Sequence, residues 1–323
     1  AMDNGTVHPP EIIDRKDAPC KENIWLGDDI DLEKLPAPVQ HMGDRNRMLQ
    51  SAGVIVCQTP CGKWTNWSNA RSSMIDKKTM AGWWLSPVQH NGMILDMWRE
   101  KGEDMPVAII LGAPPAVFIH GGSRVPDWVD EYDDASKLYG RGIEMVKCEM
   151  SDLMVPAEAE LIIEGTISIT ETCMEGPYGE QAGYLDPKKV SPKPRHDVTA
   201  VTFRDNAIIP SAVPGMPPNS HVVSISFFTS NDAVSQLQKA GFPIIDGMQN
   251  FESCGHLNVF RVKNNWHELT GWRHDEFMHK LALFLWGNHI GGGIGKVIMF
   301  GKKNNPTKQK QFIWPLPTRT HPN

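Results

Sequence analysis

The segment 175–180 reads Glu-Gly-Pro-Tyr-Gly-Glu and decides how this chain is interpreted. Proline lacks a donor N–H and glycine adopts backbone angles that other residues avoid, so a tight bend is expected between Glu175 and Glu180. Such a bend can direct both carboxyl groups into one cavity at different depths. Carboxyl groups in unequal environments have different pKa values, so one site can hold both an acid and a base. For an isolated turn, two solvated glutamates on the surface would be the better interpretation.

Six segments upstream of this bend change that interpretation. They read WTNWSNAR at 64–71, VQH at 88–90, VPDWVDE at 125–131, VKCE at 146–149, DLMVPA at 152–157 and AELIIEG at 159–165. In this order, and followed by 175–180, they resemble the UbiD family of prenylated-FMN-dependent decarboxylases. The fungal ferulic and cinnamic acid decarboxylases are the most similar branch. The resemblance covers roughly residues 25 to 320 and is densest between 60 and 185.

The resemblance implies a fold and a catalytic set. The fold is of the α+β class, with an extended arm over 1–45, a split β-barrel that binds prenylated FMN over 46–205, and an α+β domain over 206–323. The Arg-Glu-Glu set of the family corresponds to Arg71, Glu175 and Glu180. Arg71 is expected to hold the substrate carboxylate and to pair with Glu175, whereas Glu180 is expected to donate the proton that replaces carbon dioxide.

The resemblance also implies a flavin site with bound cations. The ligands of a divalent metal, Mn²⁺ or Mg²⁺, correspond to Asn66, His90 and Glu131, and the metal connects them to the cofactor phosphate. An amide, an imidazole and a carboxylate suit a fairly hard cation and leave positions open for phosphate oxygens. Gln89 is expected to contact the flavin, as is Arg71. A K⁺ site is implied at Trp67, Gly121, Ser123, Glu131 and Arg319.

The implied activity is the reversible, non-oxidative decarboxylation of an α,β-unsaturated or aromatic carboxylic acid. The implied partners are a flavin prenyltransferase, which supplies the cofactor, and a second copy of the chain in a homodimer. Two alternatives stay open. One is a catalytically degenerate homologue that acts as a partner or regulator of a full-length enzyme. The other is a plain FMN-binding oxidoreductase, although hydride transfer gives Arg71, Glu175 and Glu180 no role.

Composition excludes several other classes. The chain has 323 residues, of which 40% are hydrophobic, so it can bury a large core. The net charge is −6 and no basic stripe occurs, which argues against a nucleic-acid partner. No apolar run approaches the roughly 20 residues that cross a bilayer. The six cysteines form no CxxC pair and no signal-peptide pattern is visible, so a cytoplasmic protein with reduced thiols is expected.

Periodicity predicts the elements. Strands are expected over 54–59, 64–68, 107–111, 160–169 and 198–203, the first two joined as a hairpin by a turn at 60–63. Helices are expected over 93–98 and from Pro126 to Leu138. In the last third, a helix capped at Ser230-Asn231-Asp232 and another over 274–286 alternate with strands over 256–262 and 296–300.

Three departures from the family pattern bear on function. The chain is short at both ends relative to the family. Asp44-Arg45-Asn46-Arg47 replaces a family Asp-Gly-Gly-Arg turn. Ile290 stands where the family has a lysine that contacts the cofactor phosphate, and this change is expected to weaken phosphate binding unless Lys296 or backbone N–H groups compensate.

Overall fold

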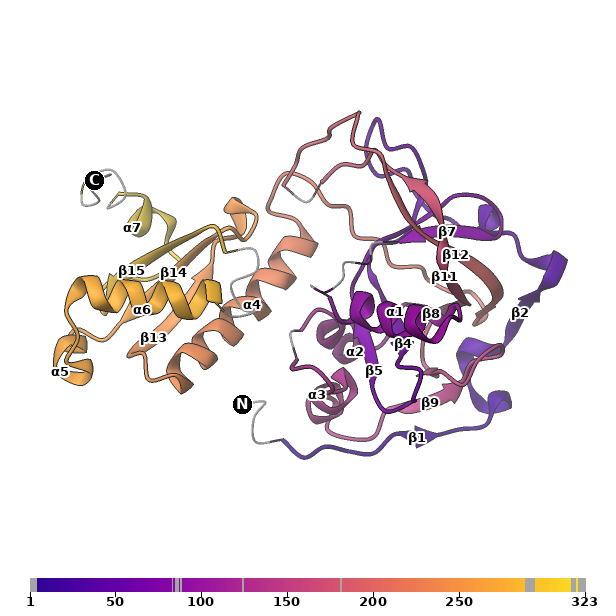
Figure 1. Cartoon of the computed structure of the whole chain (residues 1–323), viewed down its shortest axis with the longest axis horizontal. Helices are drawn as coiled ribbons and strands as arrows, with labels where there is room; N and C mark the ends of the chain where they lie inside the picture. The colour runs from indigo at the N-terminus through magenta and orange to yellow at the C-terminus, as the bar shows by residue number, and fades with distance from the viewer. Residues whose placement is uncertain are drawn as a thin grey trace. The chain divides into compact units, whose positions relative to one another are not determined.

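The computed structural model describes residues 5–82, 84, 87, 89–123, 125–180, 182–287, 294–314 and 318. Ile290 and Arg319, and the predictions that concern them, lie outside these residues. The chain divides into two compact units (Figure 1). The N-terminal unit comprises 1–179 and 185–213, and the C-terminal unit comprises 180–184 and 214–323.

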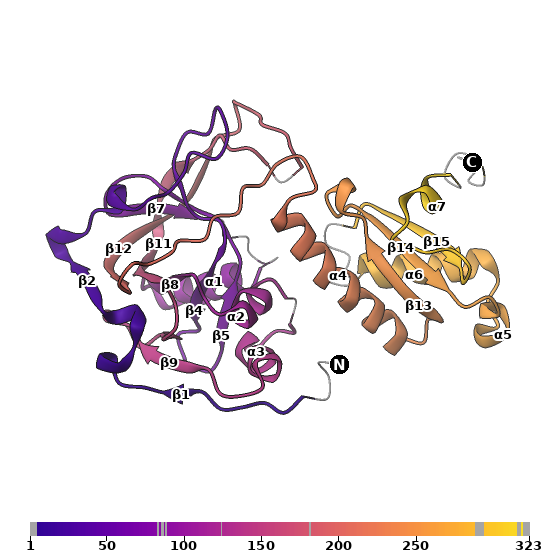
Figure 2. The same cartoon turned by 180° about the vertical axis from the view of Figure 1, so that it is seen from behind.

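A curled antiparallel sheet forms the centre of the N-terminal unit. Among the described residues it has nine strands in the order β3-β6-β7-β12-β11-β8-β4-β5, with β2 paired to β12. The long strands β11 and β12 shift register twice along their pairing, and both curve in Figures 1 and 2. The strands span Asn23–Leu26 (β2), Met48–Gln50 (β3), Gly53–Gln58 (β4), Thr65–Ser68 (β5), Ser72–Met74 (β6), Thr79–Gly82 (β7), Met105–Leu111 (β8), Leu161–Glu175 (β11) and Ser191–Phe203 (β12).

Both faces of this sheet are covered around β4 and β8, which explains why these two strands are largely apolar. Ile55 on β4 packs in one core with Ile94 of helix α1 (His90–Lys101). Its neighbour Val54 points to the other face and packs in a second core with helices α2 (Pro115–Gly121) and α3 (Glu131–Tyr139). Alternation along the strand thus assigns successive side chains to different cores.

The N-terminal segment belongs to this unit. Strand β1 (Glu11–Ile12) pairs with β9 (Glu144–Lys147), which pairs with β10 (Met154–Pro156). Lys21 is buried and its Nζ lies 3.0 Å from Glu164 Oε1 of β11 and 3.4 Å from Glu149 Oε1. Short 3₁₀ turns connect these parts at Arg15–Asp17 (η2), Pro19–Lys21 (η3), Gly27–Asp29 (η4) and Leu32–Lys34 (η5).

The C-terminal unit packs helices on a small mixed sheet. Within the described part of the chain, the sheet has the order β13-β14-β15, with bounds Ile244–Gln249, Leu257–Val262 and Lys296–Gly301. Helix α4 (Ser220–Lys239) and helix α6 (His274–Gly287) share one core with Phe260 of β14, and α6 runs across the sheet in Figure 1. The remaining short helices are η6 (Phe251–Ser253), α5 (Trp266–Thr270) and α7 (Gln309–Ile313).

Two predicted helix starts are wrong. The predicted cap at Ser230 lies inside α4, because Asn219 caps that helix by accepting the Val222 N–H. Ser230 instead donates its hydroxyl to the Ser226 carbonyl within the helix. The helix expected from Pro126 begins at Glu131, because Trp128 has a positive φ of 65° and interrupts a helical start.

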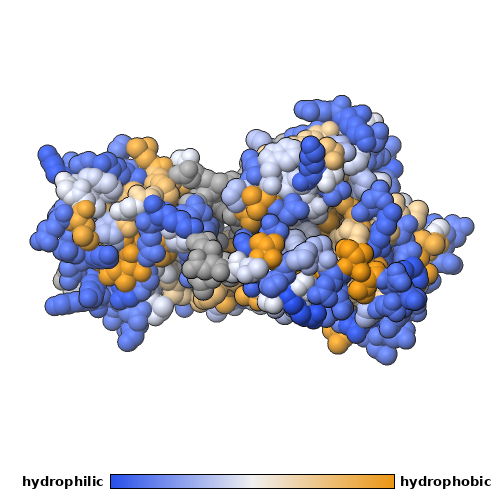
Figure 3. Space-filling view, turned by 90° about the horizontal axis from the view of Figure 1, so that it is seen from below, coloured by the Kyte–Doolittle hydropathy of each residue, from blue (hydrophilic) through white to orange (hydrophobic). Residues whose placement is uncertain are grey.

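The surface seen in Figure 3 is mostly hydrophilic, in agreement with a sequence in which 40% of the residues are hydrophobic. Hydrophilic residues cover most of the face shown in Figure 3, and hydrophobic residues occur there in separate patches. Of the helices in the described residues, none has the length and apolar character that a bilayer crossing requires.

Candidate active site

The centre of the candidate site is an ion pair between Arg71 and Glu175. Arg71 immediately precedes β6, and Glu175 is the last residue of β11. The guanidinium Nε and Nη2 each donate to one Glu175 carboxylate oxygen at 3.1 Å. The Glu175 side chain is 1% exposed and that of Arg71 is 27% exposed. The predicted pairing is therefore present, and the Arg71 side chain is partly exposed.

The turn that follows Glu175 is irregular, as the sequence predicts. The Gly176–Pro177 peptide bond is cis, and Gly176 has a φ of +91°. Tyr178 is buried, and the Arg71 guanidinium carbon lies 5.3 Å from the centre of its ring. Burial raises the pKa of the Tyr178 phenol to about 12, so this ring is neutral at physiological pH. Sequence reasoning missed Tyr178, although it lies inside the motif.

Glu180 groups with the C-terminal unit. Its backbone N–H donates to the Tyr184 carbonyl at 2.7 Å, and its carbonyl accepts the Gly183 N–H at 2.9 Å. These two bonds close a tight loop directly after the 175–180 turn. The role of Glu180 as proton donor stays a prediction.

A second polar cluster surrounds His90, the first residue of α1. Its Nδ1 lies 3.8 Å from Glu131 Oε1, and its Nε2 lies 3.0 Å from Asp127 Oδ1. Burial alone would lower the pKa of His90, but the Glu131 and Asp127 carboxylates outweigh it and raise this pKa. Burial raises the pKa of Glu131, an effect that His90 and the Trp67 N–H partly offset. Asp127 was not predicted from the sequence.

The other predicted flavin and metal residues lie on neighbouring elements. Asn66 is buried on β5, where its Nδ2 lies 3.9 Å from the Cys57 sulfur. The next residue, Trp67, donates its N–H to Glu131 Oε2 at 2.8 Å and so connects β5 to the His90 cluster. Gln89 takes the N-cap position of α1.

No group of three or more His, Cys, Asp or Glu residues in the described ranges is arranged to hold a metal ion. The predicted set has only two residues of these types, His90 and Glu131, and takes its third ligand from an amide. Gly121 and Ser123 of the predicted K⁺ site lie at the end of α2. The Gly121 carbonyl accepts the Asn69 N–H at 2.7 Å, and the Ser123 hydroxyl donates to the Ile119 carbonyl at 3.3 Å.

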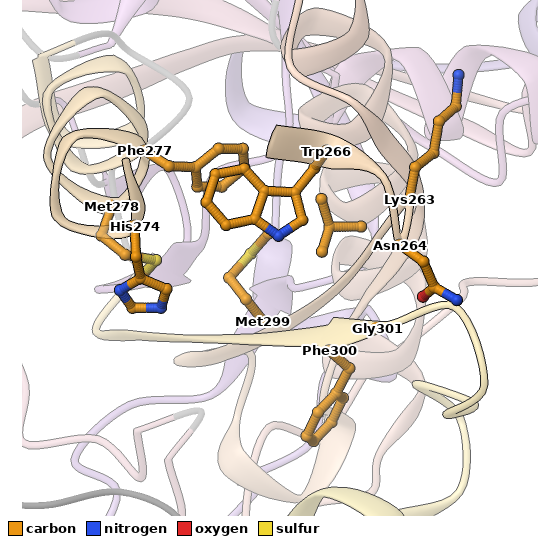
Figure 4. A pocket seen from close by; sticks show the side chains of 10 residues that line it. Lys263, Asn264, Trp266, His274, Phe277, Met278, Met299, Phe300 and Gly301 are labelled. Atoms are coloured by element: carbon orange, nitrogen blue, oxygen red, sulfur yellow. The ribbon is translucent and has the colours of Figure 1, made fainter. Parts of the chain in front are cut away.

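A pocket of about 310 Å³ occurs elsewhere, within the C-terminal unit. Trp266, Phe277 and Met299 form its apolar walls, and His274 lies at its edge in Figure 4. Its ten lining residues include no carboxylate and no arginine. Neither Arg71 nor Glu175 is among its lining residues.

The chain is thus an α+β protein whose curled antiparallel sheet carries an Arg–Glu pair at the end of its longest strand, β11. The sequence model of the family, described as the 3-octaprenyl-4-hydroxybenzoate carboxy-lyase Rift-related domain, matches residues 11–217. The chain belongs to the UbiD family.

Named relatives support this membership. The chain is 35% identical over 304 residues to a pyrrole-2-carboxylic acid decarboxylase of Pseudomonas aeruginosa, covering 94% of this chain and 61% of the relative. It is 33% identical over 316 residues to ferulic acid decarboxylase 1 of Saccharomyces cerevisiae, covering 97% of this chain and 63% of the relative. The chain thus spans less than two thirds of the length of these relatives.

A solved structure has the same fold. It is an evolved dimeric form of the UbiD-class enzyme HmfF from Pelotomaculum thermopropionicum in complex with prFMN. The TM-score is 0.85 at 25% identity, and the match covers 98% of this chain and 70% of that one. The predicted fold class, a UbiD-like α+β protein, is confirmed.

Proposed function

We propose that this chain carries the catalytic centre of a decarboxylase that acts on an α,β-unsaturated or aromatic carboxylic acid with prenylated FMN. The reaction is non-oxidative and reversible: the C–CO₂⁻ bond breaks, carbon dioxide leaves, and a proton takes its place on carbon. The observation that carries the proposal is the two-bond Arg71–Glu175 pair, which joins a buried carboxylate to a partly exposed arginine side chain. Decarboxylase names among the relatives support it.

Each catalytic residue has a role that follows from its chemistry. A planar guanidinium binds a carboxylate through two parallel hydrogen bonds, so the partly exposed Arg71 side chain holds the substrate carboxylate. Glu175 fixes the orientation of Arg71 and keeps its charge compensated before substrate binds. Glu180 delivers the proton to the carbon that loses carbon dioxide. Prenylated FMN, when bound, supplies the electron sink for the broken C–C bond.

The residues around His90 fit the cation that such a cofactor requires. Glu131 is buried, and its pKa is raised by that burial, so a nearby divalent cation would stabilise its charged form. We assign Asn66, His90 and Glu131 to Mn²⁺ or Mg²⁺, Gln89 and Arg71 to the flavin, and Trp67, Gly121, Ser123, Glu131 and Arg319 to K⁺. An amide oxygen, an imidazole and a carboxylate suit the divalent ion.

Co-expression with a flavin prenyltransferase tests the proposal against its alternatives. A decarboxylase purifies with a modified flavin spectrum and releases carbon dioxide from an acid. A degenerate homologue that acts as a partner or regulator purifies without flavin. A plain FMN oxidoreductase purifies with unmodified FMN that a nicotinamide reduces. Light scattering of the same sample tests the proposed homodimer, which the dimeric form of the HmfF relative supports.

Glu180→Gln tests the proton-donor role. The change keeps the size of the side chain and removes only its acidity, so flavin content should stay at the wild-type level. Turnover should fall by about 10²–10⁴-fold, the usual contribution of a general acid. A variant that keeps more than about a tenth of the wild-type rate removes Glu180 from this role.

A further inference from the structure

We propose that Asp44 is a positioning residue for the catalytic turn 175–180. Its side chain is 1% exposed. Carboxylate Oδ1 accepts the Gly179 backbone N–H at 2.8 Å. Oδ2 accepts the His41 backbone N–H at 2.8 Å and lies 3.1 Å from His41 Nδ1. One buried carboxylate thus joins two segments that lie 135 positions apart in the sequence.

Two further contacts join the same segments. The Arg45 N–H donates to the Pro177 carbonyl at 3.1 Å. Gly179 packs directly against the His41 ring, because a Cβ at this glycine would lie 2.4–2.6 Å from three ring atoms. We call residues 41–45 the clasp. It supplies a donor, an acceptor and a packing surface to a turn that belongs to no helix.

The position of the turn matters because of its neighbours. Glu175 is the first residue of the turn 175–180 and Glu180 is the last, so movement of the turn backbone moves the residues that carry both carboxyl groups. Tyr178, between them, lies under the Arg71 guanidinium. Displacements of about 1 Å in a catalytic group can cost on the order of 100-fold in rate. The clasp therefore fixes the catalytic geometry without contacting substrate, and this assignment rests on the proposed function.

Asp44→Asn removes the charge while keeping the shape. An amide has one acceptor oxygen and one NH₂ group, so either the Gly179 N–H or the His41 N–H loses its acceptor. We expect kcat to fall by about 10- to 100-fold, while KM and flavin occupancy change by less than about twofold. We also expect the backbone N–H groups of Gly176, Tyr178 and Gly179 to exchange hydrogen at least about tenfold faster in the flavin-free protein.

Asp31→Asn is the matched control. Asp31 also accepts a neighbouring backbone N–H, that of Glu33 at 3.1 Å, in the same N-terminal segment. Among the described residues its side chain contacts Glu33 and Lys77, which lie outside the turn, so the amide exchange of the turn and kcat should stay unchanged. Gly179→Ala is a second variant, since its Cβ displaces the His41 ring and should reproduce both effects of Asp44→Asn.

The outcomes separate the positioning role of the clasp from the proposed function of the chain. Unchanged exchange of the Gly176, Tyr178 and Gly179 N–H groups in both clasp variants overturns the clasp. Faster exchange with wild-type kcat overturns the positioning role and leaves a purely structural one. If the wild-type protein decarboxylates no acid, the proposed function fails, and hydrogen exchange alone then decides whether the clasp holds the turn.

Discussion

At the scale of single residues, geometry rather than charge distinguishes the site. Arg71 and Glu175 lie 104 positions apart in the sequence and meet through two parallel hydrogen bonds. A guanidinium has the planar fork that this arrangement needs, whereas an ammonium is a compact charge whose three donors form no planar fork. The pair therefore selects arginine specifically. The same planar fork is what the substrate carboxylate requires.

Arg71→Lys should lower kcat/KM by at least about 100-fold, because the lysine cannot bond Glu175 and the substrate with the same geometry. The melting temperature should change little, because the lysine keeps a positive charge beside the buried Glu175 carboxylate, and rates are normalised to the measured flavin content. Steady-state kinetics with the flavin-loaded protein provide the measurement. Arg195→Lys is the control, because Arg195 forms comparable ion pairs with Glu171 and Asp197 on the same sheet. Equal kinetic losses in the two variants would contradict the assignment.

We expect His196 to make the unfolding free energy depend on pH. It is fully buried on β12, and burial lowers its pKa to about 4. Neither ring nitrogen has a hydrogen-bond partner among the residues that the structure describes. In the unfolded chain the pKa of His196 is near its ordinary value of about 6.5. Between pH 6.5 and 4 the imidazole is therefore protonated in the unfolded state and still neutral in the folded state. His196 therefore lowers the unfolding free energy as the pH falls from 6.5 to 4, and it has no effect above that range.

We expect His196 to lower the unfolding free energy by roughly 2 kcal/mol at pH 5 relative to pH 7. Urea unfolding of wild type and His196→Gln at both pH values measures it, as the difference between the two proteins in their pH dependence. The exposed His279→Gln is the control. A wild-type pH dependence that persists unchanged in His196→Gln would show that other groups cause it.

At the scale of elements, local chemistry predicts strands well and long-range contacts poorly. The hairpin expected over 54–68 is confirmed as β4 and β5, because its apolar run and its turn residues are adjacent in sequence. The start of α4 was missed, because Ser224 and Ser230 donate to carbonyls one turn earlier, so residues typical of caps lie inside the helix.

The Arg71–Glu175 pair was predictable for a different reason. Arg71 and Glu175 each lie in a dense sequence motif. Asp127 lies in the motif 125–131 and Asp44 in the turn 44–47, but their contacts with His90 and Gly179 form only when distant segments fold together. One sequence without the fold contains no signal for those contacts.

The N-terminal segment should depend on one buried lysine. Glu164 accepts hydrogen bonds from Lys21 Nζ at 3.0 Å and from the Glu149 and Met150 N–H groups at 2.9 Å. Lys21→Met leaves the Glu164 carboxylate buried without its counter-charge, so the unfolding free energy should fall by about 3–5 kcal/mol. Urea unfolding measures the change.

Two further variants complete that test. Lys16→Met, at an exposed lysine, should change stability by less than about 0.5 kcal/mol. Lys21→Met combined with Glu164→Gln should recover part of the loss, because the second change removes the uncompensated charge. A double variant no more stable than Lys21→Met would show that packing, and not charge, explains the effect.

At the scale of the whole molecule, the proposed site needs a cofactor and a cation in addition to the protein residues. The proposed ligands Asn66, His90 and Glu131 would supply only three protein ligands, so we expect phosphate oxygens of the flavin to help complete the metal coordination. Metal content should therefore follow flavin content. Elemental analysis of protein purified with and without the prenyltransferase provides the measurement. Equal metal in both samples, or no metal in the flavin-loaded one, would count against the assigned ligands.

The central claim is that this chain replaces a carboxylate with a proton by means of bound prenylated FMN and the Arg71–Glu175 pair. The most direct test incubates flavin-loaded protein in D₂O with ferulic, cinnamic and pyrrole-2-carboxylic acids, and follows carbon dioxide and product by mass spectrometry. We predict that at least one acid yields carbon dioxide and a product carrying one deuterium in equal amounts, and that Glu175→Gln and flavin-free protein yield neither. Fully flavin-loaded wild-type protein that releases no carbon dioxide, or release that is equal without flavin, would contradict the claim.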